Sequence, residues 1–281
     1  MELRPALART VIALAVLGCA VAARGETNRF HRLTPQLLGK LRPASRRTAL
    51  GVGELRQASS FVAHRDGGQR ALLLTNHHVA GSGVTVGEPI TFVDGATART
   101  VRLVASNPAL DYALVEIELP PGSQVPALPL ERGGFHPGRP IYSVAAHANL
   151  YFTYPAKALG GGPQANAAIL RGPTNQFAIA SGHVDRNSIG AVTINTTGNK
   201  QITGVVSMLP NSSGMSGSPV LASDTYRVIG LHSSGNGQPN LWVETSVPIS
   251  LILQDVEWKL KSGNLDPSSV PLVDAMLRAT P

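Results

Sequence analysis

The chain has 281 residues, enough for one large or two small domains with a core of ordinary size. Charged residues make up only 15% of it, and 29 glycines with 21 prolines favour many short strands and turns over long helices. The formal net charge of +7 does not indicate a nucleic-acid partner, because the basic residues are scattered and a nucleic-acid site needs a basic patch; Arg46-Arg47 is the densest pair.

Residues 1–22 have the features of an export signal. A positive start precedes an apolar run at residues 11–19 that is too short to span a bilayer, and Ala20-Val21-Ala22 offers a small-residue cleavage site. Val16-Leu17-Gly18-Cys19 also resembles a bacterial lipobox, in which cleavage would leave Cys19 as a lipidated N-terminus. We therefore expect an exported protein, either secreted or periplasmic, or anchored through a lipid on Cys19.

Cys19 is the only cysteine, so the mature domain has no internal disulfide even though export would permit one.

Residues 23–50 are polar and basic, with a short stretch of helical pattern at Leu33–Leu41. They are expected to form an N-terminal extension. The alternative is a propeptide that ends near Arg46-Arg47.

From residue 51 the sequence changes to short apolar runs separated by turn signals. Residues 58–63 and 71–74 flank Asp66-Gly67-Gly68, which predicts a hairpin. Further strands are expected at residues 89–93, 98–105 and 112–117. In the last of these, alternate residues share one face, and Asp111 stands at the mouth of the strand.

A second group of strands is expected after the Gly133-Gly134 pair. Its members are residues 140–144, 167–170, 176–181, 191–195, 201–206, 220–222, 228–232 and 242–245. Residues 249–261 differ, because their apolar positions fall near helical spacing and two lysines stand at the end where cations favour the helix dipole. We expect a C-terminal helix there, followed by a tail at residues 263–281.

Three short motifs carry candidate chemistry. They are Thr75-Asn76-His77-His78-Val79, Asp111-Tyr112-Ala113-Leu114 and Gly214-Met215-Ser216-Gly217-Ser218-Pro219. Glycines beside a serine let the backbone fold closely enough for two amides, here those of Gly214 and Ser216, to point at one negative oxygen. Because serine alone is a poor nucleophile, this interpretation requires a base and a group that orients the base.

The three motifs resemble the active-site blocks of chymotrypsin-fold serine endopeptidases, most of all the bacterial branch of V8-type glutamyl endopeptidases and Do/HtrA proteases. The resemblance covers about residues 50–260. It implies an all-β fold of two antiparallel six-stranded β-barrels, with an active-site cleft between them and a C-terminal helix. The expected bounds are 51–262 for the domain, about 51–132 and 138–248 for the barrels, and 249–261 for the helix. The tail is too short for a PDZ module, which argues against a complete Do/HtrA protein.

The same resemblance implies peptide-bond hydrolysis through an acyl-enzyme. Ser216 would be the nucleophile, His78 the general base, and Asp111 the group that fixes the imidazole tautomer. The amides of Gly214 and Ser216 would form the oxyanion hole. No metal and no other cofactor is required, and the histidine pair lacks the H-E-x-x-H spacing of a helical zinc site.

Each assignment has an alternative. His77 could be the base in place of its neighbour, Asp111 could only cap a turn after Asn107-Pro108, and Ser216 could sit in a plain Gly-Ser turn. For the whole chain, the alternative is a catalytically inactive trypsin-like fold that serves as a peptide-binding or protein-binding module.

Gly230-Leu231-His232 resembles the Gly-Ile-His strand of glutamyl endopeptidases and viral 3C-type proteases, where the histidine lines the P1 pocket. The resemblance implies a P1 preference for Glu, or else Gln, while the alternative is a histidine buried and satisfied within the barrel. Ser233, Ser234 and Gly235 would pair with extended substrate by strand addition. We expect a monomer that acts on protein or peptide substrates, with no nucleic-acid partner and no membrane contact beyond a lipid at Cys19.

Overall fold

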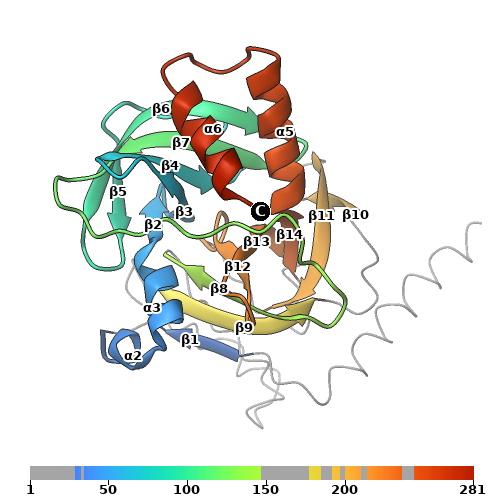
Figure 1. Ribbon diagram of the computed structural model, residues 1–281. Coiled ribbons are helices and arrows are strands. Elements are labelled where there is room, and N and C mark those ends of the chain that lie inside the picture. The colour runs from blue at the N-terminus through green and yellow to red at the C-terminus, as the bar shows by residue number, and fades with distance from the viewer. Residues whose placement is uncertain are drawn as a thin grey trace, which may run out of the picture.

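The structure is a computed structural model that describes residues 29–32, 35–146, 177–184, 192–196, 200–209, 214–235 and 244–281. Strands dominate it. They form two barrels, with two C-terminal helices above them, while the N-terminal helices lie on one side near the junction (Figure 1).

The first barrel is formed by six antiparallel strands. These are β2 (Val52–Leu55), β3 (Ala58–Arg65), β4 (Arg70–Thr75), β5 (Pro89–Phe92), β6 (Thr97–Asn107) and β7 (Tyr112–Glu118). They close in the order β2-β3-β4-β7-β6-β5. Side chains such as Leu73, Ile90 and Val115 fill its interior, and the alternating exposure along β5 shows the period-2 pattern of a strand with one buried face.

The second barrel is also formed by six antiparallel strands. These are β8 (Pro140–Ala145), β9 (Ala178–Val184), β11 (Lys200–Met208), β12 (Pro219–Ala222), β13 (Val228–Gly235) and β14 (Glu244–Pro248). The ring runs β9-β8-β12-β13-β14-β11 and closes because β11 also pairs with β9. β1 (Arg29–Arg32) extends the sheet beside β9, and β10 (Val192–Thr196) extends it beside β11. The prediction of two six-stranded barrels is confirmed, and the strand expected at 167–170 lies outside the described residues.

The described part of the N-terminal extension is folded against the barrels. It contains α2 (Pro35–Lys40) and α3 (Pro43–Leu50), and the end of α3 buries Thr48 and Ala49. The Thr48 hydroxyl shares a 3.3 Å hydrogen bond with the hydroxyl of Tyr142 in the second barrel. The Arg46-Arg47 pair therefore lies inside a helix whose last turn is packed, not in an open linker.

Two helices follow the barrels. α5 (Ile249–Lys261) has the predicted bounds and packs against β13 and β14. Where a tail was expected, the chain forms a second helix, α6 (Val270–Ala279), which packs against β3 and β4 of the first barrel. Its buried residues are Leu272, Val273, Met276 and Leu277, which is the spacing of a helix with one apolar face. Within the described residues, no helix has both the length and the apolar character needed to cross a membrane.

Candidate active site

His78 and Asp111 form a hydrogen-bonded pair. β4 ends at Thr75, and the histidines lie in α4 (His77–Ala80), a single helical turn. The His78 Nδ1 atom lies 3.0 and 2.9 Å from the two carboxylate oxygens of Asp111, and the His78 amide donates to Oδ1 at 3.1 Å. The His78 side chain is 39% exposed and the carboxylate only 9%, so the imidazole reaches solvent while its partner is shielded.

The backbone around Asp111 is held in an unusual conformation. Asp111 has φ 43°, in the left-handed region that costs a non-glycine residue about 1 to 3 kcal/mol. The buried Asn76 side chain donates to the Asp111 carbonyl at 2.9 Å, and the Ser233 hydroxyl donates to carboxylate Oδ2 at 2.5 Å. The carboxylate is therefore fixed by His78 and Ser233 and the backbone by Asn76, and the bond from Ser233 is one that local sequence patterns did not predict.

Two alternatives considered from the sequence concern His77 as the base and Asp111 as the cap of the turn after Asn107. The His77 ring packs against Gly81, where an added Cβ would lie 1.9 Å from the ring Nδ1, so the two histidines of α4 have different surroundings. The turn after Asn107 is capped by Asn107 itself, whose Oδ1 accepts from the amides of Ala109 at 2.9 Å and Leu110 at 3.3 Å. The Asp111 carboxylate is engaged with His78 and Ser233 instead.

The loop around Ser216 is shaped by two glycines with positive φ, Gly214 at 93° and Gly217 at 83°. The Gly217 amide donates to the carbonyl of His232, and the Ser218 amide donates to that of Met215. In the part of the chain that the structure describes, the amides of Gly214 and Ser216 have no hydrogen-bond partner. They are the two amides that the sequence assigned to an oxyanion hole.

The first barrel holds this loop of the second barrel through Ser59 in β3. The Ser59 amide donates to the Ser216 carbonyl at 2.8 Å, and its hydroxyl donates to the Gly214 carbonyl at 3.0 Å. The same hydroxyl accepts from the amide of Ala146 at 3.0 Å. Ser59 is fully buried and stands 155 residues from Gly214, so no local pattern could have identified the contact.

Contacts around Ser59 also bring the histidine and serine segments together. The Thr75 hydroxyl, at the end of the strand that leads into α4, donates to the Ser59 carbonyl at 2.8 Å. Gly217 lies so close that an added Cβ would be 2.0 Å from the Ser59 carbonyl oxygen and 2.4 Å from the Thr75 hydroxyl oxygen. The chain before His78 and the chain after Ser216 are therefore packed against the same residue.

His232 is 2% exposed. A buried histidine with its hydrogen bonds satisfied inside the barrel was the alternative to a P1-pocket histidine. The Nδ1 of His232 is hydrogen-bonded to the Glu244 carboxylate on β14, which is fully buried. The other Glu244 oxygen accepts from the Ser246 hydroxyl at 2.6 Å. The imidazole thus has a fixed partner at one ring nitrogen, and the identity of this partner was not predicted.

Residues 233–235 of β13 pair with β14 but not with β12. β12 pairs with β13 only from Val228 to Leu231, whereas β14 pairs as far as Gly235. The Ser233 side chain turns to Asp111, so it is the backbone of Ser233 that remains for the predicted pairing with extended substrate. Among the described residues, no strand pairs with 233–235 on the β12 side.

The C-terminal helix braces the turn that carries Asp111. Asp255 of α5 accepts hydrogen bonds from the Tyr112 hydroxyl, from Asn107 Nδ2 at 3.1 Å and from Lys259 Nζ at 2.5 Å. Burial, with the hydrogen bond to Asp255, raises the pKa of the Tyr112 phenol. Burial alone would raise the pKa of the Asp255 carboxyl, but the donors outweigh it, and this pKa lies below its usual value. The helix therefore supports the turn at both ends.

The comparisons with known proteins agree with this fold. The family described as "Trypsin-like peptidase domain" matches residues 58–231. A comparison with curated proteins finds no match.

One similar solved structure is an inactive form of Rv3671c from M. tuberculosis H37Rv with a serine-to-alanine mutation. It is 15% identical to this chain with a TM-score of 0.52, and the match covers 80% of this chain and 92% of that one. A second inactive form of the Rv3671c protease gives 16% identity and TM-score 0.50, over 80% and 95%. The HtrA-type protease AlgW with a decapeptide gives 18% and 0.46, over 71% of this chain and 50% of that one. At these identities the two Rv3671c structures show a shared fold and no more, whereas the family match spans more than half of the sequence. The chain belongs to the family of trypsin-like peptidase domains.

Proposed function

We propose that this protein is a serine endopeptidase in which Ser216, His78 and Asp111 act as the catalytic triad. The observation that carries the proposal is the bond between His78 Nδ1 and the shielded Asp111 carboxylate. A carboxylate on Nδ1 fixes the tautomer in which Nε2 bears the lone pair, and this nitrogen is the one that can accept a proton from a serine.

The reaction would be acyl transfer to water. The Ser216 oxygen attacks the substrate carbonyl while its proton passes to His78, and His78 then gives that proton to the departing amine. Water, deprotonated by the same imidazole, releases the acyl group and restores the serine. The amides of Gly214 and Ser216, which have no partner among the described residues, would bind the oxyanion, and each such donor is worth about 3 kcal/mol in comparable enzymes.

Labelling with a fluorophosphonate probe tests the assignment, since the probe reacts only with an activated serine. We expect wild-type protein to be labelled and a Ser216→Ala variant to be unlabelled, with Ser60→Ala as the labelled control, since the Ser60 hydroxyl bonds to Gly53 within the first barrel. Loss of labelling in His78→Gln would link the reactivity to the imidazole. If wild-type protein stays unlabelled, the chain is instead an inactive binding module.

For specificity, we propose that His232 selects Glu, or less strongly Gln, at P1. Because Glu244 occupies Nδ1, Nε2 is the ring nitrogen left to meet a ligand, and when the ring is protonated it presents an N–H to a carboxylate or amide oxygen. The strand edge at residues 233–235, which β12 does not reach, would pair with the substrate backbone.

A P1 peptide library tests this specificity. His232→Leu alone would leave the Glu244 carboxylate buried without its partner, which costs several kcal/mol. The informative variant is therefore His232→Leu combined with Glu244→Gln. We expect selective loss of cleavage after Glu with cleavage after small residues retained; an unchanged P1 profile in a folded variant would contradict the assignment.

We also propose that the protein is exported. Signal and lipobox patterns in residues 1–22 support this, and fractionation of a Cys19→Ser variant would separate a lipid anchor from free secretion. Processing at Arg46-Arg47 would cut α3 before its buried last turn. N-terminal sequencing of active enzyme tests for such processing.

A further inference from the structure

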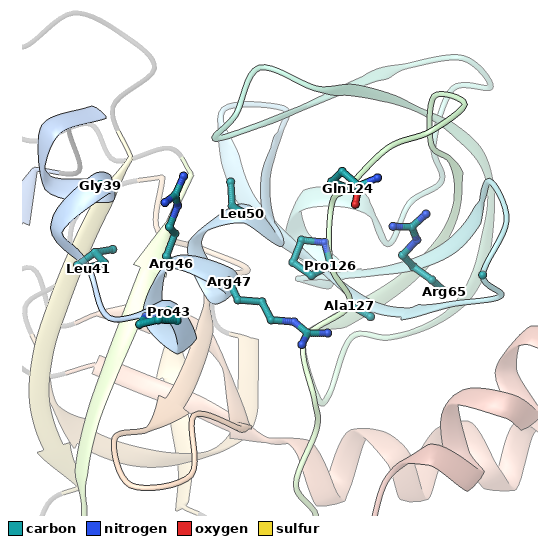
Figure 2. A pocket seen from close by; sticks show the side chains of 11 residues that line it. Gly39, Leu41, Pro43, Arg46, Arg47, Leu50, Arg65, Gln124, Pro126 and Ala127 are labelled. Atoms are coloured by element: carbon teal, nitrogen blue, oxygen red, sulfur yellow. The ribbon is translucent and has the colours of Figure 1, made fainter.

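A groove with a strongly basic lining lies between the N-terminal helices and the first barrel (Figure 2). Its volume is about 920 Å³. Three of the eleven residues that line it are arginines: Arg46 and Arg47 from α3, and Arg65 from the end of β3. None of the eleven is acidic. The fold thus brings Arg65 to the same groove as the sequence pair Arg46-Arg47.

None of these three arginines forms an ion pair with a carboxylate of the residues that the structure describes. Arg65 donates to the backbone carbonyls of Ser123, Val125 and Gly68, which fix the guanidinium but carry no net charge. Arg46 and Arg47 are exposed, and no carboxylate in the described part of the chain pairs with either of them. Arginines elsewhere on the barrels do have such partners, as Arg70, Arg102, Arg132 and Arg139 show.

An apolar pocket of about 380 Å³ adjoins the groove. Arg47 and Ala127 line both hollows, so the two meet at these residues. The pocket walls include Leu128, Leu130 and Met276 from the connection between the barrels and from α6. Together the groove and the pocket form one surface, cationic along its length and apolar at one end, which we call the arginine groove.

We propose that the arginine groove binds an acidic peptide segment that carries an aliphatic side chain, and so serves as a contact site for protein substrates or partners away from the reacting serine. The positive lining calls for a ligand with several negative charges. Tyr226 and the imidazole of His64 are the aromatic rings among the residues that line the two hollows, and both line the smaller pocket, so the groove itself lacks the stacking platform of a single-stranded nucleic-acid site. The aliphatic pocket instead suits a leucine-like anchor.

The position of the groove sets a distance requirement. β3 runs from Ser59, which holds the Ser216 loop, to Arg65 in the groove, and six residues of strand span about 20 Å. None of the residues of the proposed triad lines the groove. An extended substrate would therefore need about six residues between its scissile bond and its acidic segment.

The test is fluorescence anisotropy with a rhodamine-labelled peptide of four glutamates and one leucine, added to the full chain carrying Ser216→Ala so that no cleavage occurs. The test variant adds Arg46→Gln and Arg47→Gln; the control adds Arg99→Gln and Lys261→Gln, which remove the same charge from exposed positions outside the groove. We expect the groove variant to bind about tenfold more weakly and the control to bind as the parent does, with binding weakening as salt is raised.

Replacing the peptide's leucine by serine should weaken binding by a similar factor, because the aliphatic pocket is then unfilled. Equal affinities for the two double variants would show general charge attraction and overturn the proposal. It would also fail if the peptide did not bind, or if only a single-stranded oligonucleotide or anionic vesicles bound in a groove-dependent way. Because binding is measured without the nucleophile, these outcomes do not depend on whether the proposed hydrolysis is correct.

Discussion

The amide of Ser59 in the first barrel donates a hydrogen bond to the carbonyl of Ser216, in a loop of the second barrel. The Ser59 hydroxyl adds a bond to the Gly214 carbonyl and accepts one from the Ala146 amide. One buried residue thus fixes the Gly214–Met215 and Ser216–Gly217 peptide groups, which flank the Ser216 amide proposed to bind the oxyanion.

Ser59→Ala should lower kcat about tenfold or more with a smaller change in KM. The variant keeps the backbone bond but leaves the half-buried Gly214 carbonyl without its donor and the buried Ala146 amide without its acceptor, which costs about 1 to 3 kcal/mol. Ser60→Ala is the matched control, because its buried hydroxyl donates to Gly53 within the first barrel. Both should lose stability in urea unfolding, and only Ser59→Ala should lose turnover. Equal kcat values would remove Ser59 from the positioning of the loop.

Gly217→Ala should abolish measurable activity. A methyl group there would lie 2.0 Å from the Ser59 carbonyl oxygen, so the loop and β3 must separate. Gly263→Ala provides the comparison, since Gly263 also has positive φ, 71° against 83°, but has nothing within 4 Å of an added Cβ. The control should show only the cost of left-handed backbone, about 1 kcal/mol, in thermal unfolding with full activity. Retained activity in Gly217→Ala would contradict the close packing.

Ser233→Ala should reduce kcat about tenfold, because the Asp111 carboxylate loses the hydroxyl that donates to Oδ2. Steady-state kinetics on one peptide substrate would measure this. Ser234→Ala, one residue along the same strand and less buried, should change kcat little. If the two variants gave equal kcat, the Ser233 hydroxyl would not act on the carboxylate during turnover.

Asp255→Asn should destabilise the protein by about 2 kcal/mol at pH 7, since Asp255 accepts from Tyr112, Asn107 and Lys259. The pKa of Asp255 is lower in the folded state than its usual value of about 3.9, so the carboxylate stabilises the fold above that pH. This contribution is lost as the pH falls through the lowered pKa.

The difference in urea midpoint between wild-type and Asp255→Asn should therefore be constant from pH 7 to about 5 and shrink below about pH 4. Asp274→Asn removes a carboxylate from an exposed pair with Arg278 and should cost less than 1 kcal/mol at pH 7. A difference for Asp255→Asn that persisted at pH 2 would assign its effect to packing.

The elements predicted correctly from the sequence are those whose own residues show a clear pattern. The two apolar runs on either side of Asp66-Gly67-Gly68 predicted the hairpin of β3 and β4, and the apolar spacing of residues 249–261 predicted α5 with its observed bounds. β2 was not predicted, because Val52–Leu55 is only four residues long and is defined by pairing with β3 and β5. α6 was not predicted either, since its apolar face becomes informative only against the first barrel.

The residues of the candidate site also fall into two groups, those found in short motifs and those identified only by their contacts in the fold. Histidine, aspartate and serine motifs were recognisable as short blocks, whereas Ser59, Glu244 and Asp255 act through partners set by strand pairing and helix docking. Short side chains such as serine occur throughout the sequence, so their role is visible only when the register of two barrels is known.

The support that the Ser216 loop receives from the first barrel also has a consequence for folding. The loop belongs to the second barrel by sequence, but its backbone shape is completed by a residue of the first. A chain in which only the second barrel has formed lacks both His78 and the Ser59 support for the Ser216 loop, and a chain in which only the first barrel has formed lacks Ser216 itself. Under the proposed triad, such intermediates should not hydrolyse surrounding proteins before the two halves have joined.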